Sequence, residues 1–206
     1  MSKGLFISLE GGEGAGKTTQ ARLLCEALAA SGRTVVSVRE PGGTRLGEQA
    51  RRILKDEDEE PPTPRAELLL FLAARAQLVD NVIRPALAEG KCVVSDRFSD
   101  STFAYQGYAR GLPLDAIKAA NDFACGGLRP DVTFLLDLGA QAAASRVASR
   151  GAQDRFERED AGFHKRLADG FAARAAAEPD RFIKIDAGAP VETVAEEIWK
   201  SLKRFL

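Results

Sequence analysis

The chain has 206 residues, 45% of them hydrophobic, and its 29 Lys and Arg residues nearly balance its 30 Asp and Glu residues. This length suits one globular domain, and the net charge of −1 gives no bulk electrostatic reason to bind nucleic acid or an anionic membrane. Three Cys and one His, without a C-x-x-C spacing, argue against a closed set of disulfides and against a structural zinc site. No apolar run is long enough for a signal peptide or a membrane span, so we expect a cytoplasmic protein.

Short apolar or β-branched runs alternate with longer amphipathic runs rich in Ala and Leu, which is typical of a parallel sheet with helices on both faces. The expected strands are residues 5–9, 34–38, 92–95, 132–137 and 181–185. The expected helices are residues 17–30, 45–54, 64–89, 114–124, 140–149, 160–177 and 191–205. No linker or repeat divides the chain, so we predict a single α/β domain over residues 1–206.

A glycine-rich loop follows the first expected strand, and Gly11, Gly16, Lys17 and Thr18 satisfy the spacing G-x-x-x-x-G-K-S/T. Glycines let successive backbone N–H groups point at phosphate oxygens, and the next helix adds its positive N-terminal end. Lys17 then reaches the β- and γ-phosphates, while the Thr18 hydroxyl is placed to ligate Mg²⁺. The residues expected to bind the nucleoside triphosphate are Gly11, Gly12, Glu13, Gly14, Ala15, Gly16, Lys17, Thr18 and Thr19.

The second and third expected strands end in charged residues, and the carboxyl ends of parallel strands meet at one edge of a sheet. Arg39 and Glu40 follow the second strand, and a Pro-Gly-Gly turn leaves them facing the cleft. Asp96 and Arg97 follow the third strand. Asp96 is suited to hold Mg²⁺ directly or through water, and Arg97 to clamp donor and acceptor phosphates together. The alternative is a salt bridge at the end of the strand.

A phosphate loop occurs in GTPases, motors and kinases. The chain has no N-K-x-D stretch for guanine and is small for a motor, whereas a kinase needs a mobile cationic element over the transferring group. Arg150, Arg155 and Arg158 lie close together, so we predict a mobile lid over about residues 150–160. The alternative is an ordinary charged turn between helices. The residues expected to act in catalysis are Lys17, Arg97, Arg150 and Arg155.

Five stretches together resemble the thymidylate kinase family. They are residues 10–19, 39–44, 66–77, 96–107 and 129–131. The resemblance implies a P-loop nucleoside-monophosphate-kinase-like fold, an α/β fold with a five-stranded parallel sheet flanked by helices on both faces. It implies transfer of the γ-phosphoryl group of ATP to dTMP, giving dTDP and ADP for dTTP synthesis, with Mg²⁺ as cofactor. It also implies a homodimer whose partners are these small nucleotides rather than nucleic acid or a membrane.

The resemblance further implies a thymine pocket. Phe71 and Arg75 share one face of a helix, so the ring can stack on the base while the guanidinium donates to an exocyclic oxygen. Thr102 and Gln106 would hydrogen-bond the base or sugar, and Tyr105 would pack under the deoxyribose. The dTMP-binding residues are then Glu13, Arg39, Phe71, Arg75, Arg97, Thr102, Tyr105 and Gln106.

The same resemblance assigns Glu13 to the acceptor's sugar hydroxyl. Because the lid rather than the phosphate loop carries the arginines, the chain resembles the bacterial type within the family. Arg150 in the lid and Ala187 after the last strand would then also contact ATP, with Ala187 in a loop on the adenine side.

Two other functions remain open. A deoxynucleoside kinase would attack with a sugar hydroxyl and would need a carboxylate base, for which Glu40 is available. A regulatory switch that binds ATP and acts through protein partners would lack an acceptor pocket.

Overall fold

The computed structural model describes residues 4–55, 60–148 and 154–206. Five parallel strands form one sheet in the order β2-β3-β1-β4-β5, so β1 lies at its centre. The strands are β1 Leu5–Glu10, β2 Val35–Arg39, β3 Cys92–Asp96, β4 Val132–Asp137 and β5 Phe182–Asp186. The structure confirms all five expected strands and the predicted fold class.

The described helices cover every expected segment to within one residue, and residue 149 lies outside the described residues. They are α1 Lys17–Ala30, α2 Arg45–Lys55, α3 Pro64–Leu78, α4 Arg84–Ala88, α5 Ser99–Thr102, α6 Leu114–Cys125, α7 Ala140–Ala148, α8 Ala161–Ala177 and α9 Val191–Leu202. Two π-helical segments, Val79–Ile83 and Phe103–Ala109, and a final 3₁₀ turn, Lys203–Phe205, complete the set. Within these described residues no helix has the length and apolar character to span a bilayer.

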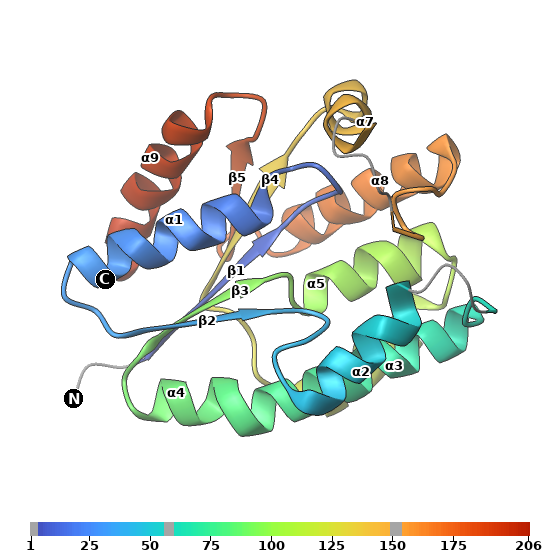
Figure 1. The fold of residues 1–206 in the computed structure, drawn as a ribbon, viewed down its shortest axis with the longest axis horizontal. Coiled ribbons are helices and arrows are strands. Elements are labelled where there is room, and N and C mark those ends of the chain that lie inside the picture. Colours follow the sequence, from blue (N-terminus) through green and yellow to red (C-terminus); the bar gives the residue numbers. More distant parts are fainter. Residues whose placement is uncertain (1–3, 56–59, 149–153) are drawn as a thin grey trace.

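Each face of the sheet is covered by helices (Figure 1). α1 and α9 pack on one face, to which Leu5, Ile7 and Leu9 of β1 contribute. α3 and α4 pack on the other face, to which Phe6 of β1 and Val93 of β3 contribute. Successive side chains of a strand point to opposite faces, which explains this division of β1 between two cores.

The expected helix over residues 64–89 is interrupted by the π-helical segment. Pro85 lacks an N–H and its ring crowds the carbonyl four residues before it, so a regular α-helix cannot continue unchanged through this position. The chain adapts just before Pro85, where the N–H of Arg84 donates to the carbonyl of Val79, five residues back. The helix then continues as α4.

A second helical stretch, Ser99–Thr102 followed by Phe103–Ala109, lies outside the helices that we expected from the apolar pattern. Its Ser, Thr, Tyr and Gly residues have low helix propensity and hide the pattern. Tertiary packing stabilises it instead, because α8 lies along it and Tyr105 contacts Phe163 and Phe171 of α8.

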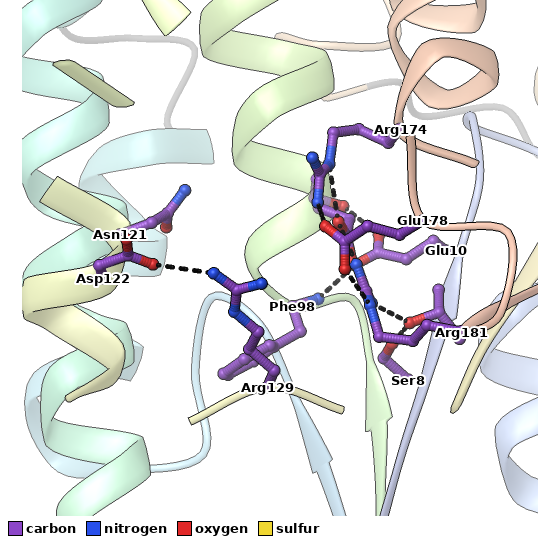
Figure 2. A network of polar contacts seen from close by, with 12 residues as sticks. Ser8, Glu10, Phe98, Asn121, Asp122, Arg129, Arg174, Glu178 and Arg181 are labelled. Carbon is purple, nitrogen blue, oxygen red and sulfur yellow. Dashed lines mark hydrogen bonds and ion pairs between the residues drawn. The ribbon is translucent and has the colours of Figure 1, made fainter. Parts of the chain in front are cut away.

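Buried charges join this stretch to β4 and to the segment before β5 (Figure 2). Asp100 is fully buried and accepts hydrogen bonds from Arg174 and Arg181. Arg181 also donates to Thr133 at 2.6 Å and to Glu178 at 2.8 Å, and Arg174 pairs with Glu178 as well. Two carboxylates thus neutralise two arginines next to the sheet, which keeps the cost of burying them low.

Glu178 generates a prediction about stability. Burial alone would raise the pKa of Glu178, but Arg181 and Arg174 outweigh burial and lower this pKa to about 2. The stability that it contributes is therefore present above its ordinary pKa and is lost as the pH falls through about 2. We expect Glu178→Gln to lower the free energy of unfolding by about 1–3 kcal/mol at pH 7, and by much less at pH 3.

Urea unfolding at both pH values measures this effect. Asp80→Asn is the matched control, because the Asp80–Arg84 pair is exposed and its loss is expected to change stability by less than about 0.5 kcal/mol. Equal losses for the two variants would contradict the account.

Candidate active site

A cavity of about 870 Å³ lies beyond the carboxyl ends of β1, β2 and β3. The topology brings together residues that are far apart in the sequence, as we expected for an open α/β sheet. The predicted site residues that line it are Glu13, Gly14, Gly16, Lys17, Thr18, Thr19, Arg39, Phe71, Arg75, Asp96, Arg97, Thr102, Tyr105 and Gln106.

The phosphate loop has the geometry that its glycines suggest. Gly16 has a φ of 86° directly before α1, and a Cβ on Gly11 would lie 2.5 Å from the carbonyl oxygen of Leu136. A side chain at Gly11 would therefore force the loop away from β4. Gly11, Gly12 and Ala15 shape this loop without lining the cavity.

Lys17 and Thr18 begin α1 at the floor of the cavity. The Lys17 ammonium donates to the Gly12 carbonyl at 2.6 Å, and burial, with the nearby charge of Arg97, lowers its pKa to about 8. The Thr18 hydroxyl donates to the Asp96 carboxylate at 2.5 Å. A cation, a hydroxyl and a carboxylate thus meet at the end of β3.

Arg97 crosses from the end of β3 to the phosphate loop. Its guanidinium donates to the Gly11 carbonyl at 2.9 Å and to the Glu13 carboxylate at 2.7 Å, and it lies 5.0 Å from the centre of the Tyr105 ring. The Tyr105 hydroxyl donates to the same oxygen of Glu13 at 2.6 Å. Burial would raise the pKa of Glu13, but Arg97 and Lys17 lower it to about 2, so Glu13 is a carboxylate at neutral pH.

Arg75 is fully buried and forms an ion pair with Glu40 at 2.5 Å. Its remaining N–H groups donate to Thr102, Asn121 and the carbonyl of Phe98, so all five donors have partners within the chain. Donation from Arg75 to a base would require one of these bonds to break. In this structure Arg75 stabilises the cavity wall. Glu40, the candidate general base from the sequence, forms its ion pair with Arg75.

Three further predicted residues have their partners away from the phosphate loop. Arg39 reaches the cavity rim, but its guanidinium pairs with Glu48 at 2.9 Å. Ala187 is buried in the core beside α9, and its N–H donates to the carbonyl of Asp137. Arg155 does not line the cavity, and Arg150 lies outside the described residues.

The comparisons with known proteins agree with this geometry. A family model described as thymidylate kinase matches residues 9–198 of the chain. The chain belongs to the thymidylate kinase family. It is 53% identical to the thymidylate kinase of Dehalococcoides mccartyi (strain ATCC BAA-2266 / KCTC 15142 / 195) over 183 residues, which cover 89% of this chain and 88% of that protein.

Two more relatives extend the similarity over nearly the whole chain. The thymidylate kinase of Synechococcus sp. (strain JA-3-3Ab) is 53% identical over 199 residues, covering 97% of this chain and 95% of that protein. The crystal structure of thymidylate kinase from Ehrlichia chaffeensis matches with a TM-score of 0.79 at 34% identity, over 98% of this chain and 99% of that chain.

Sequence reasoning missed a buried residue that supports the cavity wall, Glu67, whose partner Gln106 lines the cavity. Its fully buried carboxylate accepts hydrogen bonds from Gln106 at 2.8 Å, from Arg110 at 3.2 Å and from Arg155 at 2.7 Å. A buried carboxylate requires such partners, which explains why Arg155 points to α3 rather than into the cavity. The available signal was a single Glu within the apolar run at 66–74.

The segment after residue 153 closes one side of the cavity. Phe156 is buried, with its ring centre 6.1 Å from that of Phe71 and 5.7 Å from that of Tyr105. Asp154 forms an ion pair with Lys55 at 2.5 Å. The part of the predicted lid that the structure describes is thus held against α2 and α3.

Proposed function

We propose that the cavity beyond β1, β2 and β3 is where this chain carries out its reaction. As a thymidylate kinase, the chain phosphorylates dTMP to dTDP with ATP. The observation that supports this location most strongly is the double contact of Glu13, which accepts hydrogen bonds from Arg97 and Tyr105. It joins the phosphate loop to the predicted acceptor pocket within one cavity.

The phosphate loop is proposed to bind ATP. Its backbone N–H groups and the first turn of α1 form an anion site, and Lys17 would exchange its contact with Gly12 for the β- and γ-phosphates. Arg150 and the loop near Ala187 remain predicted ATP contacts. The N–H of Ala187 is already used by Asp137, so any contact there would come from another atom of the loop.

Thr18 and Asp96 are proposed to hold Mg²⁺. Their oxygens face the cavity 2.5 Å apart, and both are hard donors of the kind that this ion prefers. Among the described residues no group of three or more His, Cys, Asp or Glu could hold a metal ion. This fits a cation that keeps several waters and binds through one carboxylate and the substrate phosphates. When bound, it would neutralise phosphate charge.

The acceptor pocket is proposed to take the thymine ring between Phe71 and the wall formed by Thr102 and Gln106. Phe71 is half-buried and lines the cavity, so its ring is available for stacking. Tyr105 is held by Glu13 where it would pack under the deoxyribose. Arg39 at the rim would reach the acceptor phosphate by leaving Glu48.

In this reaction a phosphate oxygen of dTMP attacks the γ-phosphorus of ATP, the bond from that phosphorus to the β–γ bridging oxygen breaks, and ADP leaves. A phosphate monoester is mostly dianionic at pH 7 because its second pKa is about 6, so it needs no general base. Positioning and charge neutralisation then carry the catalysis, through Lys17, Arg97 and the lid arginines. Glu40 forms an ion pair with Arg75 and is therefore not free to act as a general base, which agrees with a reaction that needs none.

We expect Arg97→Ala to lower kcat by about 100- to 1000-fold while the dissociation constant for ATP changes less than about fivefold. Arg155→Ala is expected to lower kcat as well, because the proposed closed lid would turn this arginine from Glu67 to the phosphates. A coupled assay for ADP with dTMP as acceptor measures kcat, and nucleotide titration measures affinity.

Arg166→Ala is the control, since Arg166 donates to the carbonyl of Ala109 and does not line the cavity. Unchanged turnover in both test variants would refute the assigned roles. Turnover with thymidine in place of dTMP would refute the proposed acceptor site.

A homodimer is proposed as well. Phe123 of α6 and Leu69 of α3 are 90% and 64% exposed, and these two helices pack against each other, so their exposed apolar side chains are proposed to contribute to the dimer contact. We expect the chain to sediment as a dimer and Phe123→Asp to sediment as a monomer. Val191→Asp, on α9 over the other face of the sheet, should remain dimeric. A monomeric wild-type chain would contradict the proposal.

A further inference from the structure

Glu10 is a buried carboxylate outside the residues proposed to bind the nucleotides or to act in catalysis. It is the last residue of β1, at the centre of the sheet, and its side chain is fully buried. One carboxylate oxygen accepts the N–H of Phe98 at 2.8 Å, and the other accepts the Ser101 hydroxyl at 2.6 Å. Figure 2 shows Glu10 beside the backbone of Phe98.

Both of these contacts lie next to Arg97. The backbone of Arg97 has a φ of 72°, and among the described residues it is the only one other than glycine with a positive φ. This left-handed conformation costs about 1–2 kcal/mol for a residue with a side chain, so neighbouring contacts must maintain it. Glu10 binds the N–H that directly follows Arg97, and Ser95 donates to the Arg97 carbonyl at 2.6 Å.

The side chain of Arg97 is also linked to Glu10. Its guanidinium donates at 3.3 Å to the Ser101 oxygen, whose hydroxyl proton goes to Glu10. The neighbouring arginines 174 and 181 are bound by Asp100. Lys17 and Arg75 also feel the charge of Glu10, but among the described residues Arg97 is the cation joined to it through a shared hydroxyl.

We propose that Glu10 is a positioning residue that holds the backbone and guanidinium of Arg97 in the orientation that reaches the phosphates. This inference rests on the proposed catalytic role of Arg97. A carboxylate suits the task because it offers an acceptor oxygen to each donor, whereas a glutamine would turn its NH₂ group toward one of them.

The burial of Glu10 is electrostatically unfavourable, which agrees with a role beyond packing. Burial, with the nearby charge of Asp100, raises the pKa of Glu10 to about 7, although Ser101, Arg97 and Phe98 oppose this. Sites where a fold retains such a group despite the cost are frequently functional.

A double-mutant cycle tests the proposal. Glu10→Gln is expected to lower kcat about tenfold or more, with KM for ATP and dTMP within about threefold of wild type, because the lost orientation matters at the transferring phosphoryl. In the Arg97→Ala background the same change should lower kcat by less than about twofold, since the residue through which Glu10 acts is already gone.

Thr133→Val is the matched control. Thr133 is also a buried polar residue of the sheet, and it contacts Ser8 and Arg181 rather than Arg97. We expect it to lower stability in urea unfolding and to leave kcat within about twofold of wild type.

If Glu10→Gln does not fold, Ser101→Ala replaces it in the cycle. We then expect Ser101→Ala to lower kcat about threefold or more, and the losses again not to multiply in the Arg97→Ala background.

The outcomes separate the two proposals. Full kcat in Glu10→Gln, or losses that multiply in the double variant, would overturn the positioning role and leave the role of Arg97 intact. Full kcat in Arg97→Ala would instead overturn the proposed catalytic role, and with it the reason for positioning this arginine.

Discussion

The ion pair between Arg97 and Glu13 connects the phosphate loop with the side of the cavity proposed to bind the acceptor. Arg97 follows β3, Glu13 lies in the phosphate loop after β1, and these strands are neighbours at the centre of the sheet. Tyr105 joins the same carboxylate from the π-helical segment. One acidic side chain thus fixes the position of the cation that we propose for the phosphates and of the aromatic ring that we propose for the acceptor.

Most buried charges around this pair have a partner of opposite charge. Arg75 pairs with Glu40, and Arg174 and Arg181 pair with Asp100 and Glu178. Breaking such a buried set by removing one member is costly, on the order of 3–5 kcal/mol. The Arg75–Glu40 pair therefore makes the part of the cavity wall that it lines rigid, while Lys17 and Arg97 face the cavity. Pre-organised cations of this kind need little rearrangement when charge develops during phosphoryl transfer.

The sequence predicted best what depends on local spacing. The first strand, the glycines of the phosphate loop and the Lys17-Thr18 pair lie within one short stretch. Short apolar or β-branched runs identified all five strands to within one residue. The partner of Arg75 could not be predicted, because Glu40 is 35 residues away and meets it only when α3 packs beside the end of β2. The same applies to Glu67, whose partners Arg110 and Arg155 come from two later segments.

The helix over Ser99–Ala109 was missed for another reason. Its residues favour turns and loops, and packing against α8 overrides that preference. The conformation of Arg97 was equally hidden, since an arginine, unlike a glycine or an asparagine, does not signal a positive φ.

Arg97, held by Glu13 and by the backbone after β3, is proposed to reach the phosphates of both nucleotides. A crystal structure of the chain with dTMP, Mg²⁺ and a non-hydrolysable ATP analogue tests it most directly. The account predicts that Arg97 keeps its left-handed backbone and its contact with Glu13 while its guanidinium donates to a phosphate oxygen. Phosphates bound in the cavity with Arg97 turned away from them would contradict it.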